Sequence, residues 1–160
     1  MTDTGDAWTY CRAGHRHWGR YGAAGLLAST SDGLVLLHKR APWSHHGGTW
    51  STPGGALNRG ESAVTGALRE AAEECGLNTE LVAVTGIVSD DHGDWSYETV
   101  VASAPYALAV NTASSETGEV AWTAIDDVQS LNLHPGFAGM WPELQTQINQ
   151  RKDQEAAWPN

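Results

Sequence analysis

The stretch 54–77, GGALNRGESAVTGALREAAEECGL, carries most of the information about fold that the sequence holds. It begins with two glycines and continues into a segment with helical periodicity over residues 62–75. Ser62 is a suitable N-cap for such a helix, and Gly76 stands where a C-cap glycine ends one. The stretch therefore predicts a glycine loop that runs directly into a helix.

The acidic residues of this helix gather on one side. At 3.6 residues per turn, Glu73 and Glu74 lie about −60° and +40° from Glu70 around the helix axis. An apolar stripe occupies a separate arc, at about +100° to +160°, and consists of Val64, Leu68, Ala71 and Cys75. One interpretation is a solvated acidic face, because charge clusters are common on protein surfaces. The other is a set of hard oxygen ligands for Mg²⁺ or Mn²⁺.

The surroundings of the helix favour the metal interpretation. Gly54 and Gly55 allow the backbone to approach an anion closely, and the N-terminus of a helix favours phosphate. Glycine loop, helix and carboxylates together are typical of a site for a metal-bound phosphate.

The spacing within this stretch resembles the Nudix box, G-x5-E-x7-R-E-U-x-E-E-x-G-U, in which U is aliphatic. All seven positions that demand a single residue type match, and Ala71 is a small occupant of the first aliphatic position. The matching residues are Gly55, Glu61, Arg69, Glu70, Ala71, Glu73, Glu74, Gly76 and Leu77. A spacing match of this length is far more specific than a lone glycine motif.

The resemblance implies an α+β Nudix fold, an α/β/α sandwich around a mixed β-sheet. It also implies hydrolysis of a nucleoside diphosphate linked to another group. Glu70, Glu73 and Glu74 would then bind the divalent metal, with Mg²⁺ or Mn²⁺ as the cofactor. Arg69 would orient a glutamate through a salt bridge, and Glu61 would support the loop or a metal-bound water. Gly54 and Gly55 would let the loop pass close to metal and phosphates.

MutT-like members of the family carry a further glutamate before a tryptophan-containing strand. The segment SSETGEVAWTAI, residues 114–125, offers Glu116 and Glu119, of which Glu116 has the better spacing for a catalytic, metal-binding role. Glu98 is a weaker third candidate, and each is equally readable as an ordinary surface acid. Arg40 matches a position that contacts nucleotide in MutT-like members, although it could equally be a plain surface charge.

Aromatic and histidine-rich loops flank these candidates. The loop 43–50, WSHHGGTW, would border the base pocket, and Trp95 and Tyr97 are candidates for substrate contact. Cys11, His15 and His17 are residue types that bind zinc, but the neighbouring sequence lacks a fourth ligand, so we do not predict a zinc site.

The rest of the chain indicates an α+β domain of 160 residues, 1–160, in one piece. We expect an irregular N-terminal arm over 1–18 and a frayed tail over 151–160. A terminal helix is expected at 135–150. Strands are expected at 21–30, 33–40, 49–53, 81–90, 98–110 (interrupted at Pro105) and 119–125.

Charge and composition exclude several function classes. The formal net charge is −10, and residues 70–150 contain thirteen acidic residues but no Lys or Arg. Binding to a nucleic acid polymer requires Lys and Arg to displace counterions, so we expect none. No apolar run approaches the length of a membrane span. The acidic N-terminus resembles no signal peptide, and two cysteines are too few for a disulfide framework. We therefore expect a cytoplasmic protein.

Substrate identity is the most open question. Sequence elements typical of ADP-ribose and NADH pyrophosphatases are absent, which favours a (deoxy)nucleoside triphosphate, including oxidised ones such as 8-oxo-dGTP, cleaved to monophosphate and pyrophosphate. The alternatives are another nucleoside diphosphate derivative, such as a nucleotide sugar or ADP-ribose, and a non-catalytic ligand sensor. Small Nudix domains often dimerise, so a homodimer is also considered, although no interface is evident.

Overall fold

A seven-stranded sheet forms the centre of the computed structural model, which describes residues 2–157. β3 and β8 run parallel, and the other strand pairs are antiparallel, so the sheet is mixed as predicted. Five strands follow the order β5-β4-β3-β8-β7, with β6 paired to β3 and β9 paired to β4. The strands are β3 (Ala23–Ser29), β4 (Leu34–Arg40), β5 (Trp50–Ser51), β6 (Gly54–Ala56), β7 (Ala83–Asp91), β8 (Ser96–Ser103) and β9 (Thr117–Ala124).

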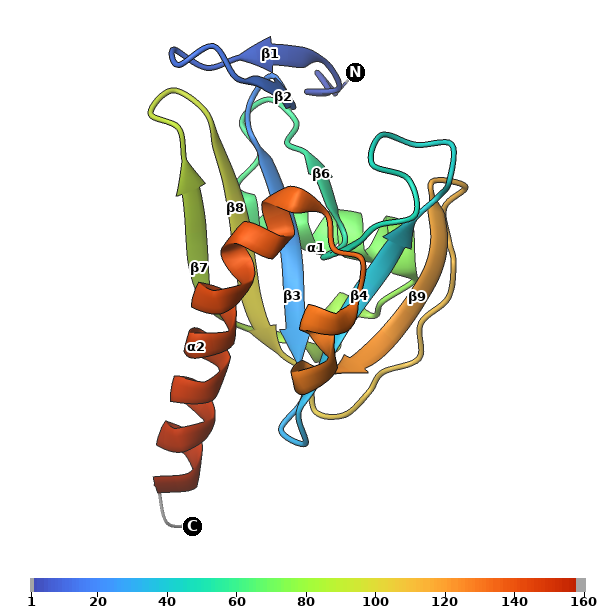
Figure 1. Ribbon diagram of the computed structural model, residues 1–160, viewed down its shortest axis with the longest axis vertical. Helices are drawn as coiled ribbons and strands as arrows, with labels where there is room; N and C mark the ends of the chain where they lie inside the picture. The colour runs from blue at the N-terminus through green and yellow to red at the C-terminus, as the bar shows by residue number, and fades with distance from the viewer. Residues whose placement is uncertain (1, 158–160) are drawn as a thin grey trace.

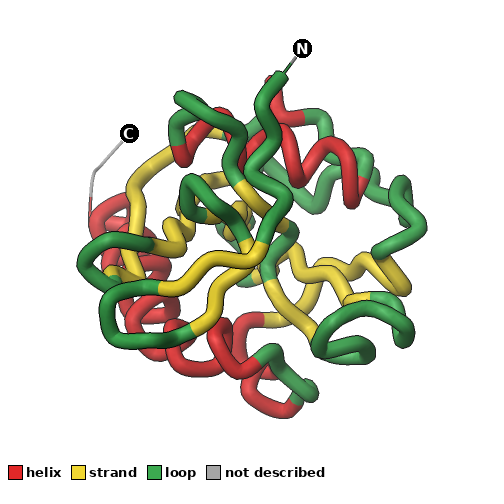
Figure 2. The backbone as a smooth tube through the Cα atoms, turned by 90° about the horizontal axis from the view of Figure 1, so that it is seen from above, coloured by secondary structure: helices red, strands yellow, loops and turns green. Residues whose placement is uncertain are grey.

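Two helices cover opposite faces of this sheet (Figure 1, Figure 2), namely α1 (Ala63–Cys75) and α2 (Pro135–Ala157). Every residue of β3 is buried, because successive side chains point to opposite faces and both faces are covered. Leu26 therefore packs in the core under α1, and Leu27 packs in the core under α2. The result is the predicted α/β/α arrangement, with one apolar core on each side of the sheet.

The helix α1 forms where the sequence predicts it. The Ser62 side chain accepts a hydrogen bond from the Thr65 N–H, and Gly76 adopts φ 62°, the left-handed conformation of a C-cap. Ala67, Ala71 and Cys75 are buried against the sheet. The apolar stripe therefore faces the core and leaves the neighbouring acidic arc beside the edge of the sheet.

The strands around the site diverge. β3 and β4 pair at Ser29 and Val35, near the end of β3. The beginning of β3, at Ala23, Ala24 and Gly25, pairs with β6 instead. The glycine loop of the prediction is therefore partly a strand, because its backbone completes β3. This divergence of β4 from β3 opens the space in which the candidate site lies.

Other boundaries also differ from the sequence-based expectations. The prediction of an irregular N-terminal arm is wrong, because β1 (Trp8–Tyr10) and β2 (Arg16–Trp18) form an antiparallel hairpin. The strand expected at 98–110 ends at Ser103, just before Pro105, which has no N–H to donate to a ladder. The helix α2 continues to Ala157, beyond the expected end at 150, so the expected fraying does not apply to residues 151–157. Residues 158–160 of the expected tail lie outside the described residues.

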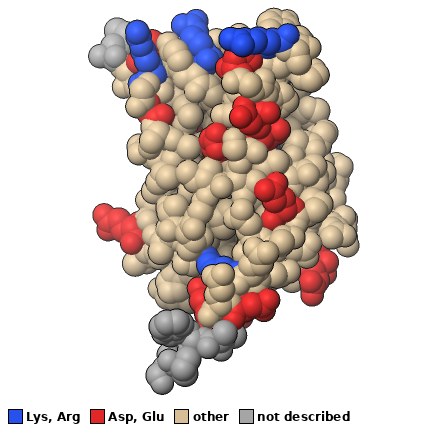
Figure 3. Space-filling model, turned by 90° about the vertical axis from the view of Figure 1, so that its left-hand side faces the viewer, with Lys and Arg blue, Asp and Glu red and all other residues tan. Residues whose placement is uncertain are grey.

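Charged side chains are unevenly distributed over the surface. On the face drawn in Figure 3, basic side chains gather mainly at one end, and acidic side chains are scattered over the remainder. Among the described residues, no helix combines the length and apolar character needed to cross a membrane. Both cysteines, Cys11 and Cys75, are buried free thiols.

The central position of β3 leads to a stability prediction. Leu26 is fully buried, so Leu26→Ala should lower the free energy of unfolding by about 2–5 kcal/mol through lost burial and the cavity left behind. Leu81, which is 47% exposed, gives the matched control, because Leu81→Ala should cost far less. Urea denaturation of both variants measures the difference, and equal losses would contradict the packing described.

Candidate functional site

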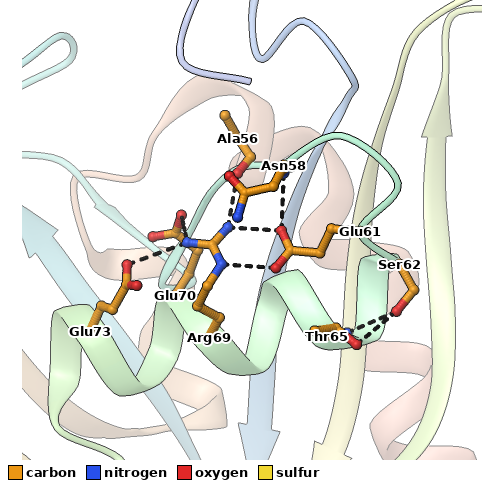
Figure 4. A network of polar contacts seen from close by, with 8 residues as sticks. All are labelled: Ala56, Asn58, Glu61, Ser62, Thr65, Arg69, Glu70 and Glu73. Carbon is orange, nitrogen blue, oxygen red and sulfur yellow. Dashed lines mark hydrogen bonds and ion pairs between the residues drawn. The ribbon is translucent and has the colours of Figure 1, made fainter. Parts of the chain in front are cut away.

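Arg69 is the centre of a polar network between α1 and the loop that precedes it (Figure 4). Its guanidinium donates two hydrogen bonds of 2.9 Å to the two carboxylate oxygens of Glu61. It also donates to the Ala56 carbonyl at 3.1 Å, to Glu70 at 3.0 Å and to Glu73 at 3.3 Å. Paired hydrogen bonds of this kind fix geometry as well as charge. The network therefore ties the end of β6 and the loop after it to the acidic face of α1.

Glu61 is held from its other side as well. Its Oε1 atom accepts a hydrogen bond of 3.0 Å from the Asn58 N–H. The hydrogen bonds from Arg69 hold the pKa of Glu61 below its ordinary value, because they stabilise the charged form more than burial opposes it. Glu61 thus fastens the loop to α1.

The two glycines lie directly against two carboxylates of α1. The Gly54 N–H donates to Glu74 Oε2 at 3.2 Å, and a Cβ atom on Gly55 would lie 2.5 Å from Glu70 Oε1. A Cβ atom on Gly54 would lie 2.5 Å from the Ala24 carbonyl oxygen. A side chain at Gly54 would collide with the backbone of β3, and one at Gly55 would push the Glu70 carboxylate aside. Glycine at both positions therefore permits this approach.

The carboxylates differ in their surroundings. Glu70 and Glu74 are largely buried, with side-chain exposures of 14% and 10%, whereas that of Glu73 is 58%. Burial raises the pKa of Glu70, and burial together with the charge of Glu70 raises the pKa of Glu74 to about 8. His38 Nδ1 lies 3.5 Å from Glu74 Oε2, and burial lowers the pKa of His38 to about 4. Both shifts favour the uncharged forms of these two side chains.

A cavity of about 660 Å³ opens beside the glycines. Its volume lies within the range of about 300–1,000 Å³ that is usual for small-molecule sites. Gly54, Gly55, Arg40 and Glu116 all line it, so the fold brings these four site candidates together. Glu70 and Glu74 lie behind the glycine backbone, as their contacts with Gly55 and Gly54 show.

Arg40 and Glu116 come from separate segments. Arg40 ends β4 and donates from Nε to the His45 carbonyl at 2.6 Å, which fastens the loop after β4. Glu116 precedes β9, and its carbonyl accepts from the Ala41 N–H at 2.9 Å. Glu119, the alternative acid, pairs with Lys39 at 3.7 Å and does not line the cavity. Glu98 accepts hydrogen bonds from Ser89 and Ser96.

The wall of the cavity is rich in aromatic rings, some of which the sequence did not suggest. Those expected near substrate do line it: Trp43, His45, His46, Trp95 and Tyr97. Those not suggested are Trp8 and Trp18 from the N-terminal hairpin and His134, Phe137 and Met140 near the start of α2. The sequence signal for the hairpin was weak: residues 8–18, WTYCRAGHRHW, contain several aromatic residues but no recognisable hairpin turn motif.

The family model of the NUDIX domain matches residues 19–144. The chain belongs to the Nudix family. A Mycobacterium tuberculosis (strain H37Rv) protein named "Putative 8-oxo-dGTP diphosphatase 3" is 45% identical over 152 residues, which cover 89% of this chain and 70% of that protein.

Two further relatives agree. A Nudix hydrolase from M. smegmatis, RenU, has a crystal structure with a TM-score of 0.82 and 40% identity, covering 91% of this chain and 96% of that chain. A Bifidobacterium longum "Nucleoside triphosphate pyrophosphatase/Nudix hydrolase fusion protein" is 37% identical over 154 residues, covering 91% of this chain and 32% of that protein. The predicted family, the Nudix fold and the assignment as a pyrophosphohydrolase enzyme are confirmed. Hydrolases of this family use divalent metal ions and act on small nucleotide substrates.

The Arg69–Glu61 pair leads to a pH-dependent prediction. Because the folded-state pKa of Glu61 lies below its unfolded value, its stabilising effect is present above about pH 4.5 and is lost as the pH falls through the folded value. Glu61→Gln should lower the free energy of unfolding by about 1.5–3 kcal/mol at pH 7, as expected for hydrogen bonds to a charged group.

Denaturant unfolding at pH 7 and at pH 3 measures this dependence. The difference between wild type and Glu61→Gln should shrink at the lower pH. Glu143→Gln, an exposed change on α2, serves as the control and should show little difference at either pH. A Glu61→Gln loss that stays constant across this range would contradict an ion-pair origin.

Proposed function

We propose that this Nudix hydrolase cleaves a (deoxy)nucleoside triphosphate to the monophosphate and pyrophosphate, with an oxidised purine nucleotide such as 8-oxo-dGTP as the preferred substrate. The observation that carries the proposal is the junction of cavity and carboxylates. A nucleotide-sized cavity ends at Gly54 and Gly55, and the backbone of these glycines lies against Glu74 and Glu70. A base in the cavity would therefore bring its phosphates to the acidic face of α1.

The donor set fits a hard divalent cation. Glu70, Glu73 and Glu74 share one face of α1, and the guanidinium of Arg69 bonds to Glu70 and Glu73 without bonding to Glu74. Oxygen donors of this kind suit Mg²⁺ or Mn²⁺, which bind through carboxylates and substrate phosphates. These three glutamates would hold the ion, with the Gly54 backbone and Glu116 as further donors. When bound, the ion neutralises phosphate charge and makes an attacking water more acidic.

The residues of the cavity support a nucleotide as the substrate. Arg40 supplies a cation at the cavity wall, where a phosphate or a base oxygen could pair with it. Trp18, Trp95 and Phe137 supply apolar ring surface of the kind on which bases stack. The preference for an oxidised nucleotide has its support in the 45% identity to the M. tuberculosis protein whose name specifies 8-oxo-dGTP.

The proposed reaction is a simple hydrolysis. One water adds across the phosphoanhydride bond between the α- and β-phosphates, and that bond breaks. The water oxygen remains on one of the two products, and its protons pass to the products or to solvent. Arg69 would orient Glu70 and Glu73, and the loop held by Glu61 would keep the glycine backbone in place.

The central test is Glu74→Gln, which keeps the shape of the side chain and removes the carboxylate that would hold the ion. We expect kcat to fall by about 10²–10³-fold, as for other losses of transition-state charge stabilisation. The assay follows pyrophosphate and monophosphate release from 8-oxo-dGTP, dGTP, ADP-ribose and a nucleotide sugar with Mg²⁺ and with Mn²⁺. Glu143→Gln is the matched control and should retain wild-type rates.

Each outcome of this panel has a clear meaning. Equimolar pyrophosphate and monophosphate from 8-oxo-dGTP, faster than from dGTP, supports the proposal. If wild type cleaves only the nucleotide sugar or ADP-ribose, the proposed substrate is wrong. If wild type turns over none of these compounds, the proposed activity is wrong. Full metal-dependent activity of Glu74→Gln would remove that residue from the metal site.

A second test separates the two candidate acids before and within β9. Glu116 lines the cavity, whereas Glu119 is paired with Lys39 and has a side-chain exposure of 62%. Glu116→Gln should therefore lower kcat by about 10²-fold, the lower range for a group that transfers protons in the reaction. Glu119→Gln should leave it within about twofold, and steady-state kinetics on the same substrate would reveal the reverse order if the assignment were wrong.

A further inference from the structure

Four side chains of metal-binding type meet at the end of the molecule that carries the N-terminal hairpin. They are Cys11, His15, His17 and His92, and each offers one ligand atom within 4.8 Å of the others. Cys11 and His15 bound the turn between β1 and β2, His17 lies in β2, and His92 lies in the turn between β7 and β8. The two hairpins lie side by side at this end of the molecule (Figure 1).

We propose that these four residues form a structural zinc site that joins the N-terminal hairpin to the β7–β8 hairpin. The site is separate from the carboxylates of α1, and the proposal does not depend on the proposed function. It also corrects the expectation that no fourth ligand exists, because His92 is brought to the other three by the fold.

The donor set is the first argument for zinc. One thiolate and three imidazoles are nitrogen and sulfur ligands, which Zn²⁺ accepts in four-coordinate tetrahedral sites closed to solvent ligands. In such a site the ligand atoms lie about 3.3–3.6 Å apart, as zinc bond lengths of about 2.0–2.3 Å require. Ligand atoms at the observed limit of 4.8 Å would therefore move about 1.2–1.5 Å closer together through side-chain rotation. Mg²⁺, in contrast, prefers oxygen ligands.

The backbone of the N-terminal hairpin positions three of the four ligands. The Cys11 N–H donates to the His15 carbonyl at 3.0 Å, and the Gly14 N–H donates to the Cys11 carbonyl at 2.9 Å. Gly14 has φ 85°, which closes this tight turn. His15 and His17 are two residues apart, so their side chains leave an extended chain on the same face. The turn thus presents three donors toward one point.

The fourth ligand, His92, comes from the β7–β8 turn. The His92 N–H donates to the Trp95 carbonyl at 2.8 Å, which closes this turn. Asp90 Oδ2 lies 3.4 Å from His92 Nε2, in the manner of the carboxylates that orient metal-binding imidazoles. Trp95 stacks on the ring of His17 with a centroid separation of 3.9 Å and an interplanar angle of 8°. Two of the three imidazole rings, those of His17 and His92, are therefore held in place by neighbours.

Two members of the cluster, Cys11 and His17, bring buried polar groups to it. Cys11 is only 5% exposed and its thiol is free. His17 Nε2 is buried and, among the residues that the structure describes, has no hydrogen-bond partner. Buried polar atoms are normally satisfied, so an orphaned imidazole nitrogen beside a buried thiol and two more imidazoles indicates a missing ligand.

The fold also gives zinc a structural task. The β1–β2 pair is a separate two-stranded sheet, a unit that is at best marginally stable by itself. Contacts between the two hairpins include a hydrogen bond of 2.8 Å from Trp95 Nε1 to the Gly19 carbonyl and an ion pair of 3.8 Å between Arg12 and Asp94. A metal crosslink would add a much stronger link, and His17, His92 and Trp95 all line the cavity that it would hold in shape.

The experiment measures metal content and ligand type on the full chain. Wild type is purified without chelator, loaded with Zn²⁺ and dialysed against excess Mg²⁺, which should displace zinc from oxygen ligands but not from thiolate and imidazole. We expect about one zinc per chain by elemental analysis. Zinc X-ray absorption should show one sulfur and three nitrogen neighbours, and Co²⁺-loaded protein should show a thiolate-to-cobalt absorption band.

Cys11→Ser and His92→Asn test the assignment to these residues. Both variants should lose the bound zinc, and Cys11→Ser should also lose the cobalt band. His46→Asn, in a separate group of histidines on the cavity wall, is the matched control and should keep about one zinc per chain. Zn²⁺ should raise the melting temperature of wild type and leave that of Cys11→Ser unchanged.

Several results would overturn the proposal. These are wild type without zinc after dialysis, an absorption spectrum without a sulfur neighbour, and zinc retained by Cys11→Ser but lost from His46→Asn. The spectra of wild type decide the question even where a variant fails to fold.

Discussion

The double hydrogen bond between Arg69 and Glu61 is the constraint on which the candidate site depends. It joins α1 to the loop that follows β6, and the same guanidinium holds the Ala56 carbonyl at the end of that strand. Because β6 is only three residues long, this attachment fixes where its glycines lie. The guanidinium has further N–H groups for Glu70 and Glu73, so one side chain sets both the loop and part of the acidic face. A lysine could not do this, because it lacks the planar, multiple-donor head group.

The sequence predicts this part of the molecule well because the information is local. The caps Ser62 and Gly76, the apolar stripe and the acidic arc all belong to one helix, and helical geometry relates them without knowledge of the rest of the fold. The strands β3, β4 and β9 are also recognisable from their apolar runs. The extension of α2 from residue 150 to Ala157 was not predicted, because residues 151–157, RKDQEAA, are mainly polar and carry no apolar periodicity.

The hairpin at the N-terminus shows where local information ends. Nothing in the turn at residues 11–15 matches a strong hairpin motif, and the hairpin is separate from the main sheet. Its position depends on residues of the β7–β8 turn, above all Trp95, far along the chain. For the same reason, three candidate ligands of the cysteine–histidine cluster were recognised as a group but the fourth was not. The spacing of His92 from the others has no meaning until the fold brings the two turns together.

The two groups of candidate ligands differ in donor chemistry. The acidic face of α1, against the glycines that line the cavity, offers carboxylate oxygens, whereas the cysteine–histidine cluster offers one thiol and three imidazoles. Hard ions such as Mg²⁺ prefer oxygen donors, and Zn²⁺ binds well to sulfur and nitrogen donors. In the proposed sites, the cluster would supply four protein donors and leave no position for substrate, while the carboxylates would leave positions for phosphate and water. Donor type and the number of open positions would thus give the two proposed metal sites different roles, although His17 and His92 line the same cavity as Gly54 and Gly55.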